Sequence, residues 1–269
     1  AWENYGLPFV IEQRAALDAA GTIVAYDYEG WSAARGGRPG GNNPGNVVTG
    51  FVAGFQPAAF APRTPAPAPT AFVADNNTAP SYVTGRVGDK AGGVGLVASE
   101  RVVSHRVLSP FFTGPLRAPE RLQNTYAHEC FMDEVAAHAK ADPVEYRLRH
   151  IRDPRLIEIV RTAAKTAGWQ ARPSPRVNAA GTRQAAGTVS GRGFACVACE
   201  SDNSYVAMAA DVDVNRSTGV VIVRRLVISA DCGPISNPDG LRNQLEGGAL
   251  HGVSRALNEE VTWDDQRVT

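Results

Sequence analysis

The sequence predicts an α+β fold in which mixed or antiparallel sheets pack against helices. Candidate strands come first, candidate helices follow at 119–168, and further strands precede a last helix at 238–258. Runs of strands separated from runs of helices favour α+β over a regular βα alternation. A chain of 269 residues is long enough to bury a sizeable core in one or two domains.

The first part of the chain is predominantly extended or irregular. Residues 8–31 predict a β-hairpin, because two apolar extended runs flank the turn DAAG at 18–21. Residues 32–80 are rich in Gly, Asn, Pro and Ala, which predicts a long irregular connection with one short strand near 47–55. A further strand is expected at 101–108.

Three helices are expected next, and each has a recognisable start. Pro119 suits the first position of a helix at about 119–139. Asp142 and Asp153 each precede a proline and can cap a shorter helix. The second of these helices should end near Gly168, because glycine readily adopts the left-handed conformation of a C-cap.

Residues 171–189 are polar and predict a surface linker between two parts of the chain. The first part, 1–170, holds the hairpin, the long loop and the three helices. The second part, 190–269, holds a strand at about 193–200, a hairpin at about 205–230 and the last helix.

Charge and cysteine content exclude several classes of protein. The chain has 27 basic and 27 acidic side chains, without the basic excess of a nucleic-acid-binding protein. It has no apolar run of membrane-spanning length. Four cysteines do not form a disulfide framework, and Cys196 and Cys199 lack a second pair at zinc-site spacing. We expect no metal site and no iron–sulfur cluster on this chain.

The stretch 231–260 carries the main functional signal. Asn237 is a good N-cap for the last helix, and Pro238 suits its first position. Glycines interrupt this helix at Gly240, Gly247, Gly248 and Gly252. Each lowers helix stability by about 1 kcal/mol relative to alanine, so another helix or a ligand should approach the backbone. The helix N-terminus suits an anion, and Gln244 offers amide donors and an acceptor.

A second candidate site lies at the start of the first long helix. Arg117 stands at the junction of a loop and this helix, where its planar fork could clamp a phosphate or carboxylate, although a plain surface arginine is the alternative. His128, Glu129 and Met132 share one helical face only roughly, so we expect them to be packed rather than catalytic.

Two segments together resemble a known family. The stretch NPDG-x-x-NQLEGG-x-x-x-G-x-SRAL-x-EEVTWD and the stretch LRAPERLQNTYAHECFMDEVA are similar to the molybdenum hydroxylase large subunits, the xanthine dehydrogenase and aldehyde oxidase superfamily. The resemblance is strongest to beta subunits of the isoquinoline 1-oxidoreductase type. It implies a fold of the molybdopterin-binding domain type.

The resemblance also implies roles for particular residues. Gln244 would hydrogen-bond the molybdenum cofactor, with the adjacent glycines beside it. The remaining cofactor contacts would be Gly247, Gly248, Arg117, Ala118, Pro119 and Gly233. More distant family members have a glycine-rich version of the loop at 117–119. His251 would border the cofactor or pack between helices.

Cofactors and partners follow from the same resemblance. It implies a molybdenum–molybdopterin cofactor in the cytosine dinucleotide form and 2Fe-2S clusters on an iron–sulfur small subunit. The substrate would be an aldehyde or an N-heterocycle, and the setting the bacterial cytoplasm or periplasm. We expect the chain to be a fragment that associates with the remainder of a large subunit, since it opens without Met.

The resemblance leaves the catalytic residue unassigned. The family's general base is a Glu in a GxGE segment, and the 269 residues contain no such segment. We therefore expect this chain alone to be inactive. The alternative is a non-catalytic α+β binding or assembly module that keeps the scaffold without the chemistry.

Overall fold

The computed structural model describes most of the chain, in residues 5–33, 44–46, 48–57, 81–84, 86–87, 90–91, 97–107, 116–174, 187–199 and 204–264. The strands are β1 (Phe9–Leu17), β2 (Ile23–Ala33), β3 (Arg86–Val87), β4 (Lys90–Ala91), β5 (Ser99–Val107), β6 (Thr188–Cys199), β7 (Ser204–Asn215) and β8 (Val221–Asp231). The helices are the 3-10 turn η1 (Pro44–Asn46), α1 (Val48–Val52), α2 (Ser81–Thr84), α3 (Arg121–His138), α4 (Pro143–His150), α5 (Pro154–Ala167) and α6 (Pro238–Leu257).

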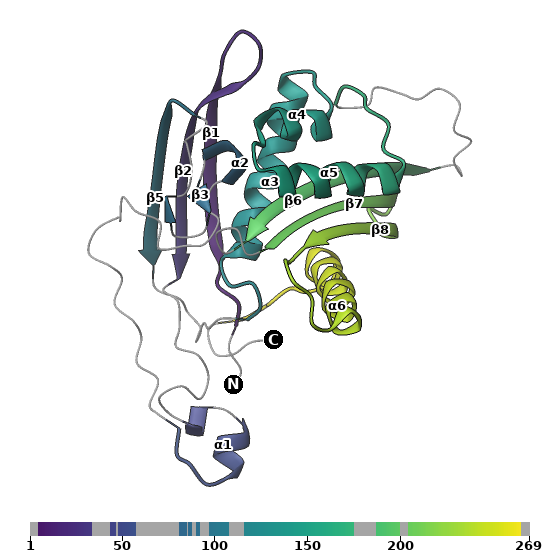
Figure 1. Ribbon diagram of the computed structural model, residues 1–269. Coiled ribbons are helices and arrows are strands. Elements are labelled where there is room, and N and C mark those ends of the chain that lie inside the picture. Colours follow the sequence, from purple (N-terminus) through teal and green to yellow (C-terminus); the bar gives the residue numbers. More distant parts are fainter. Residues whose placement is uncertain are drawn as a thin grey trace.

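Two three-stranded sheets flank the helices, as Figure 1 shows. The first has the order β1-β2-β5, in which β1 and β2 are antiparallel while β2 and β5 are parallel. The second has the order β6-β7-β8 and is antiparallel throughout. The short strands β3 and β4 pair with each other. This arrangement confirms the predicted α+β class with mixed and antiparallel sheets.

The capping residues of two helices behave as predicted. The Asp142 side chain accepts hydrogen bonds from the N–H groups of Val144 and Glu145 at the start of α4. Asp153 caps α5 in the same way, and Gly168 ends that helix in the left-handed conformation with φ 65°.

The start of α3 was predicted two residues too early. The helix begins at Arg121, and Pro119 lies before it. The reason is local: Glu120 has φ 65°, which is incompatible with the right-handed helical backbone.

The short strand predicted near 47–55 was wrong, because residues Val48–Val52 form helix α1. Local hydrogen bonds hold this turn, from Ala53 N–H to the Thr49 carbonyl and from Phe55 N–H to the Gly50 carbonyl. A strand needs a neighbouring strand to satisfy the same backbone groups, and none pairs with this segment within the described residues. The rest of the predicted irregular connection lies largely outside the described residues.

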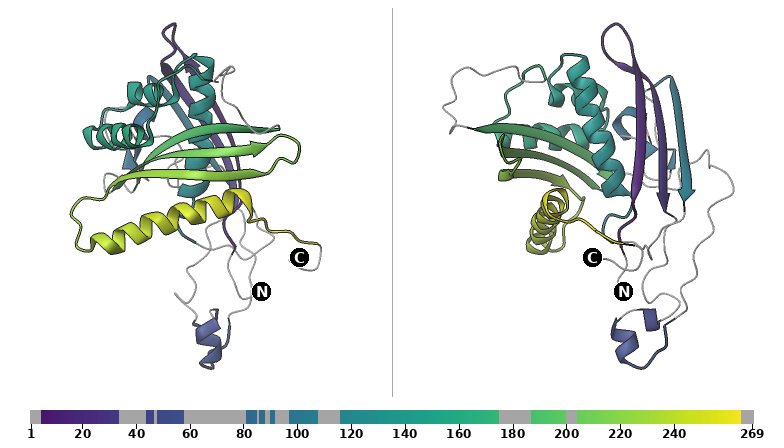
Figure 2. Two further views of the ribbon diagram at one scale, coloured as in Figure 1. Left: turned by 90° about the vertical axis from the view of Figure 1, so that its right-hand side faces the viewer. Right: turned by 180° about the vertical axis from the view of Figure 1, so that it is seen from behind.

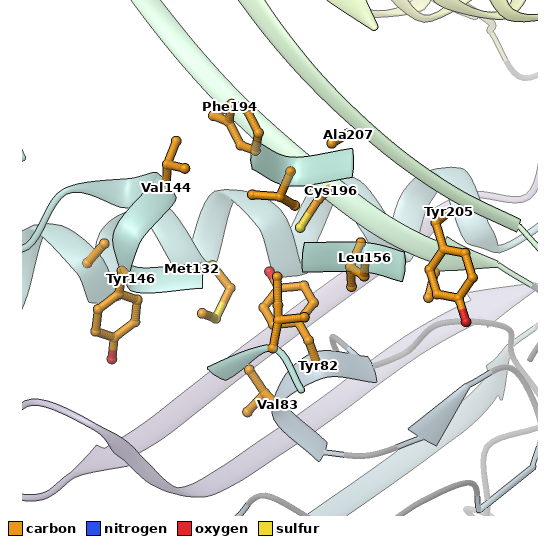
Figure 3. Packing of buried hydrophobic residues seen from close by; sticks show 14 of the residues in the cluster. Tyr82, Val83, Met132, Val144, Tyr146, Leu156, Phe194, Cys196, Tyr205 and Ala207 are labelled. Carbon is orange, nitrogen blue, oxygen red and sulfur yellow. The ribbon is translucent and has the colours of Figure 1, made fainter. Parts of the chain in front are cut away.

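One apolar core joins the first sheet, the helices and the second sheet. The core-facing side chains of β6 and β7 alternate along their strands, with Phe194, Cys196 and Ala207 buried. Figure 3 shows Tyr82 directed toward Cys196, and Met132 belongs to the same buried cluster. Cys196 is buried and Cys199 is partly exposed, because residues at an odd separation lie on opposite faces of a strand.

Helix α6 stands apart from this core. It lies beside β8, at the edge of the second sheet, while α5 crosses β7 and β8 (Figure 2). Within α6, which is described along its whole length, Ala249 alone is buried. Most of the surface of α6 is therefore not covered by the described part of the chain. No helix in the described parts of the chain is long and apolar enough to cross a membrane.

Candidate functional site

The two segments singled out in the sequence meet in space. Arg117, in the loop before α3, places Nη2 at 3.3 Å from the backbone oxygen of Gln244 and at 3.3 Å from its side-chain Oε1. Its Nη1 lies 3.3 Å from Nδ1 of His251. One exposed arginine thus contacts two side chains of α6 that are separated by two helical turns.

The chemistry of arginine settles the orientation of both partners. A guanidinium has donors and no acceptor, so Gln244 must offer its Oε1 to Arg117 and His251 must offer an unprotonated Nδ1. The Nε2 amide group of Gln244 then has its two hydrogens for another acceptor. Arg117 therefore contributes a positive charge and orients a neutral donor beside it.

The glycines of α6 leave open surface around these groups. A Cβ atom built on Gly247 or Gly252 would meet nothing within 4 Å. A Cβ on Gly248 would meet only the Arg117 Nη2, at 3.4 Å. No helix in the described structure covers these positions, which removes the helix-packing explanation for Gly247 and Gly252 there. The helix surface at Gly247 and Gly252 is therefore uncovered by other described residues.

The loop that carries Arg117 has an unusual backbone. Ala118 has φ 53° and Glu120 has φ 65°, both in the left-handed region that non-glycine residues seldom adopt. Such a conformation costs about 1–3 kcal/mol per residue, and strained backbone of this kind concentrates at ligand-binding positions. Both residues flank Pro119, which the family resemblance also assigned to the site.

Gly233 lies in the turn between β8 and α6, apart from the contacts of Arg117. It has φ 71°, and its N–H donates a 2.9 Å hydrogen bond to the Asp231 carboxylate. Arg155 donates two hydrogen bonds to the same carboxylate, from Nε at 2.7 Å and from Nη2 at 2.8 Å. No sequence pattern indicates this ion pair, because its residues are 76 positions apart and lie in unrelated motifs.

The residues that we expected to be packed are indeed buried away from this surface. Glu129 is paired with the buried Arg147 at 2.9 Å and accepts hydrogen bonds from the Tyr82 hydroxyl and the Cys196 N–H. Burial alone raises the pKa of Glu129, but Arg147, His128 and Tyr82 together hold that pKa at about 2. These groups act as a structural ion pair with its hydrogen-bond partners, rather than as a catalytic cluster.

The cysteines do not form a site in this structure. None of the four is in a disulfide bond, and burial raises the pKa of Cys196 well above its usual value. Across the described residues, no group of three or more His, Cys, Asp or Glu side chains could hold a metal ion.

The chain belongs to the molybdopterin cofactor-binding domain family, whose model matches residues 120–269. This range contains α3 and the whole second sheet with α6.

Two relatives are named as subunits of a dehydrogenase and of an oxidoreductase. The chain is 31% identical over 274 residues to a nicotinate dehydrogenase subunit of Pseudomonas putida, covering 99% of this chain and 20% of that protein. It is 32% identical over 140 residues to the beta subunit of isoquinoline 1-oxidoreductase from Brevundimonas diminuta, covering 52% of this chain and 16% of that protein. The chain thus spans a fifth or less of the length of these two relatives.

A solved structure has a similar fold. The aldehyde oxidoreductase of Desulfovibrio gigas superposes with a TM-score of 0.54 over 93% of this chain and 40% of that one, at 12% sequence identity. At this identity the similarity shows the fold alone.

The residues present fit the group that this family binds. Molybdopterin carries a phosphate and a ring rich in hydrogen-bonding atoms. Arg117 offers a cation for a phosphate, and Gln244 offers amide donors for a ring acceptor. The uncovered glycine surface of α6 provides space for close approach to the helix backbone.

Proposed function

We propose that this chain is the molybdopterin-binding part of a molybdenum hydroxylase. The enzyme would oxidise an aldehyde or an N-heterocycle with oxygen derived from water and pass electrons to an iron–sulfur partner subunit. The observation that carries the proposal is the convergence of Arg117, Gln244 and the uncovered glycines on one exposed surface.

The protein and the cofactor have separate tasks in this proposal. When bound, the cofactor supplies the two-electron oxidation of a substrate carbon. Arg117 would hold a phosphate oxygen and keep Oε1 of Gln244 engaged, so that the amide hydrogens of Gln244 face the cofactor. Gly247 and Gly248 would let the cofactor lie against the helix, since neither carries a side chain. Ala118 and Pro119 would form the rim of this surface.

The substrate class rests on the relatives. Two of them have names that specify aromatic N-heterocycles, nicotinate and isoquinoline. The structural relative is named for aldehydes. We propose an N-heterocycle or an aldehyde as the substrate, and the cytosine dinucleotide form of the cofactor.

We also propose that the 269 residues alone do not catalyse the reaction. The family's general base lies in a GxGE segment that this sequence does not contain. Dye-linked oxidation of an aldehyde or a quinoline by the 269-residue chain, abolished when tungsten replaces molybdenum, would contradict this proposal.

The direct test is cofactor analysis of the natural protein that contains these residues, purified from a host that makes molybdopterin. Molybdenum and pterin in a ratio near one to one with the protein would support the proposal. A folded protein with neither would favour a non-catalytic binding or assembly module instead.

A further inference from the structure

The turn that leads into α6 is held at one carboxylate. Asp231 is the last residue of β8, and Arg155 grips it with two parallel hydrogen bonds, from Nε to Oδ2 at 2.7 Å and from Nη2 to Oδ1 at 2.8 Å. Bidentate pairing of this kind fixes the direction of a carboxylate as well as its distance.

The gripped carboxylate in turn shapes the backbone that follows. Oδ1 of Asp231 also accepts the N–H of Gly233 at 2.9 Å, which closes a tight turn immediately after the strand. Gly233 has φ 71°, a value that glycine adopts without strain. Donors from Arg155 and Gly233 lower the pKa of Asp231, so this carboxylate stays ionised at neutral pH.

Arg155 is itself held firmly in place. Its guanidinium lies over the ring of Tyr205, 4.7 Å from the ring centre. The Tyr205 hydroxyl donates a 2.6 Å hydrogen bond to Asp153, the residue whose carboxylate caps α5. Tyr205 is also the cross-strand neighbour of Asp231 in the ladder of β7 and β8. The guanidinium that binds Asp231 is thus held in place by the start of α5 and by Tyr205 of β7.

Helix α6 has few other attachments. Within its full described length only Ala249 is buried, and residues 234–239 at its start are exposed. Among the described residues, its other hydrogen bonds to a distant segment come from the exposed Arg117. The direction of α6 therefore depends on how the turn 231–237 leaves the sheet.

We infer that Arg155 is a positioning residue for the cofactor-binding helix. Its hydrogen bonds to Asp231 fix the conformation of the turn 231–237. That conformation in turn determines the position of Gln244 and of the glycine surface of α6. The connection to the cofactor rests on the proposed function, whereas the effect on α6 does not.

The test begins with amide hydrogen exchange of the 269-residue chain without cofactor. In Arg155→Gln, exchange at Gly233, Gly240 and Leu241 should accelerate about tenfold, because the variant loses charge-assisted hydrogen bonds to Asp231. Arg155→Lys keeps the charge but loses the fork, so it should restore protection only partly. Amides of β6 and β7 should change by less than about twofold in both variants.

A matched control breaks a similar ion pair at the other end of the same sheet. Arg224 places Nε 2.7 Å from Oδ2 of Asp213, and both residues are remote from the turn into α6. Arg224→Gln should leave exchange at Gly233 and Leu241 unchanged. Unchanged exchange there in Arg155→Gln, or an equal change in the control, would overturn the inference. A uniform loss of protection in the milder Arg155→Lys would overturn it too, since Arg155 would then hold the whole domain.

The second readout is molybdenum content of the natural protein carrying the same substitutions. Arg155→Gln should lower it severalfold relative to Arg224→Gln, with Arg155→Lys between them. If the wild-type protein contains no molybdenum, the proposed function fails while the exchange result still decides the role of Arg155 in α6. If the wild-type protein contains molybdenum and Arg155→Gln contains as much, Arg155 does not contribute to cofactor binding.

Discussion

Arg117 and Gln244 are 127 positions apart in the chain, yet Nη2 of the arginine lies 3.3 Å from Oε1 of the glutamine. The contact joins the strained loop before α3 to the helix that carries uncovered glycines. It also gives the glutamine amide a defined direction, because arginine can only donate. Two segments that were assigned separately from the sequence thus form one surface.

Substitution of Arg117 should impair cofactor binding more than stability. Arg117→Gln removes charge-assisted hydrogen bonds that are worth about 1.5–3 kcal/mol, which corresponds to roughly ten- to hundredfold in cofactor affinity. Because the side chain is exposed, the free energy of unfolding should change by no more than about 0.5 kcal/mol. Molybdenum content and urea denaturation measure the two effects.

Arg149→Gln is the matched control for this variant. Arg149 is also exposed, and its Nη1 donates to the carbonyl of Ala20 at 3.2 Å, far in sequence from α6. Equal losses of molybdenum in both variants would show that Arg117 has no specific role.

Adding a methyl group to Gly247 should stabilise the helix and weaken cofactor binding. A Cβ there meets nothing within 4 Å, so Gly247→Ala should gain up to about 1 kcal/mol of stability from helix propensity. The same methyl group would occupy the surface assigned to the cofactor. The melting temperature of Gly247→Ala should therefore rise, while its molybdenum content should fall.

Gly252→Ala separates the two effects. Its Cβ also meets nothing within 4 Å, but the position was not assigned to the cofactor. It should give a similar gain in stability with unchanged molybdenum content. Loss of molybdenum in Gly252→Ala but not in Gly247→Ala would move the cofactor surface toward the C-terminal end of α6.

Local signals predicted most of the helices and strands, because their causes lie within a few residues. Asp142, Asp153 and Gly168 act through hydrogen bonds or backbone angles of their immediate neighbours. The start of α3 failed for an equally local reason, since the left-handed conformation of Glu120 is not encoded by a glycine. The division of the chain at 171–189 stays a prediction, since residues 175–186 lie outside the described part.

Pairings over long sequence distances could not be predicted in the same way. Periodicity cannot place Arg117 next to Gln244, or Arg155 next to Asp231, because only the folded topology brings these segments together. The family resemblance assigned Arg117 and Gln244 to one cofactor but said nothing of their mutual contact. The role of Arg155 emerged only from the structure.

The buried pair of Glu129 and Arg147 should be structural. Arg147 is 0% exposed, so Glu129→Ala would leave a buried charge without one of its partners and destabilise the fold by about 3–5 kcal/mol. Asp133 also binds Arg147, at 2.6 Å, but its side chain is 43% exposed. Asp133→Ala should therefore lower stability by only about 1 kcal/mol or less.

Urea denaturation of both variants measures this difference. A Glu129→Ala protein with normal stability and no molybdenum would contradict the structural assignment and place Glu129 in the functional site.

His150 should make the fold less stable in mild acid. Its Nε2 accepts the Ile23 N–H at 3.2 Å and its Nδ1 donates to the Tyr146 carbonyl at 2.9 Å, an arrangement that requires the neutral ring. Burial lowers the pKa of His150 below the value of about 6.5 expected in the unfolded chain. The contribution of His150 is therefore fully present above about pH 6.5 and is lost as pH falls below that value.

The free energy of unfolding between pH 7 and pH 5 measures this effect, with His150→Gln as the control. Glu129 does not interfere, because its contribution is lost only below about pH 4.3, as pH falls toward its folded pKa. The wild-type protein should lose stability more steeply than His150→Gln across this window. Equal slopes would mean that another group is responsible.

The most direct test of the central claim is the cofactor content of Gln244→Ala in the natural protein that contains these residues. Gln244 is exposed in the chain without cofactor, so the variant should fold with a stability change of no more than about 0.5 kcal/mol. If Gln244 hydrogen-bonds molybdopterin, its loss leaves cofactor atoms without a hydrogen-bond partner, at a cost of about 1–3 kcal/mol. This cost lowers the cofactor affinity by up to roughly two orders of magnitude. We predict a folded protein purified with markedly less molybdenum and pterin than the wild type. Wild-type molybdenum content with unchanged turnover would contradict the assignment of Gln244 and of the surface around it.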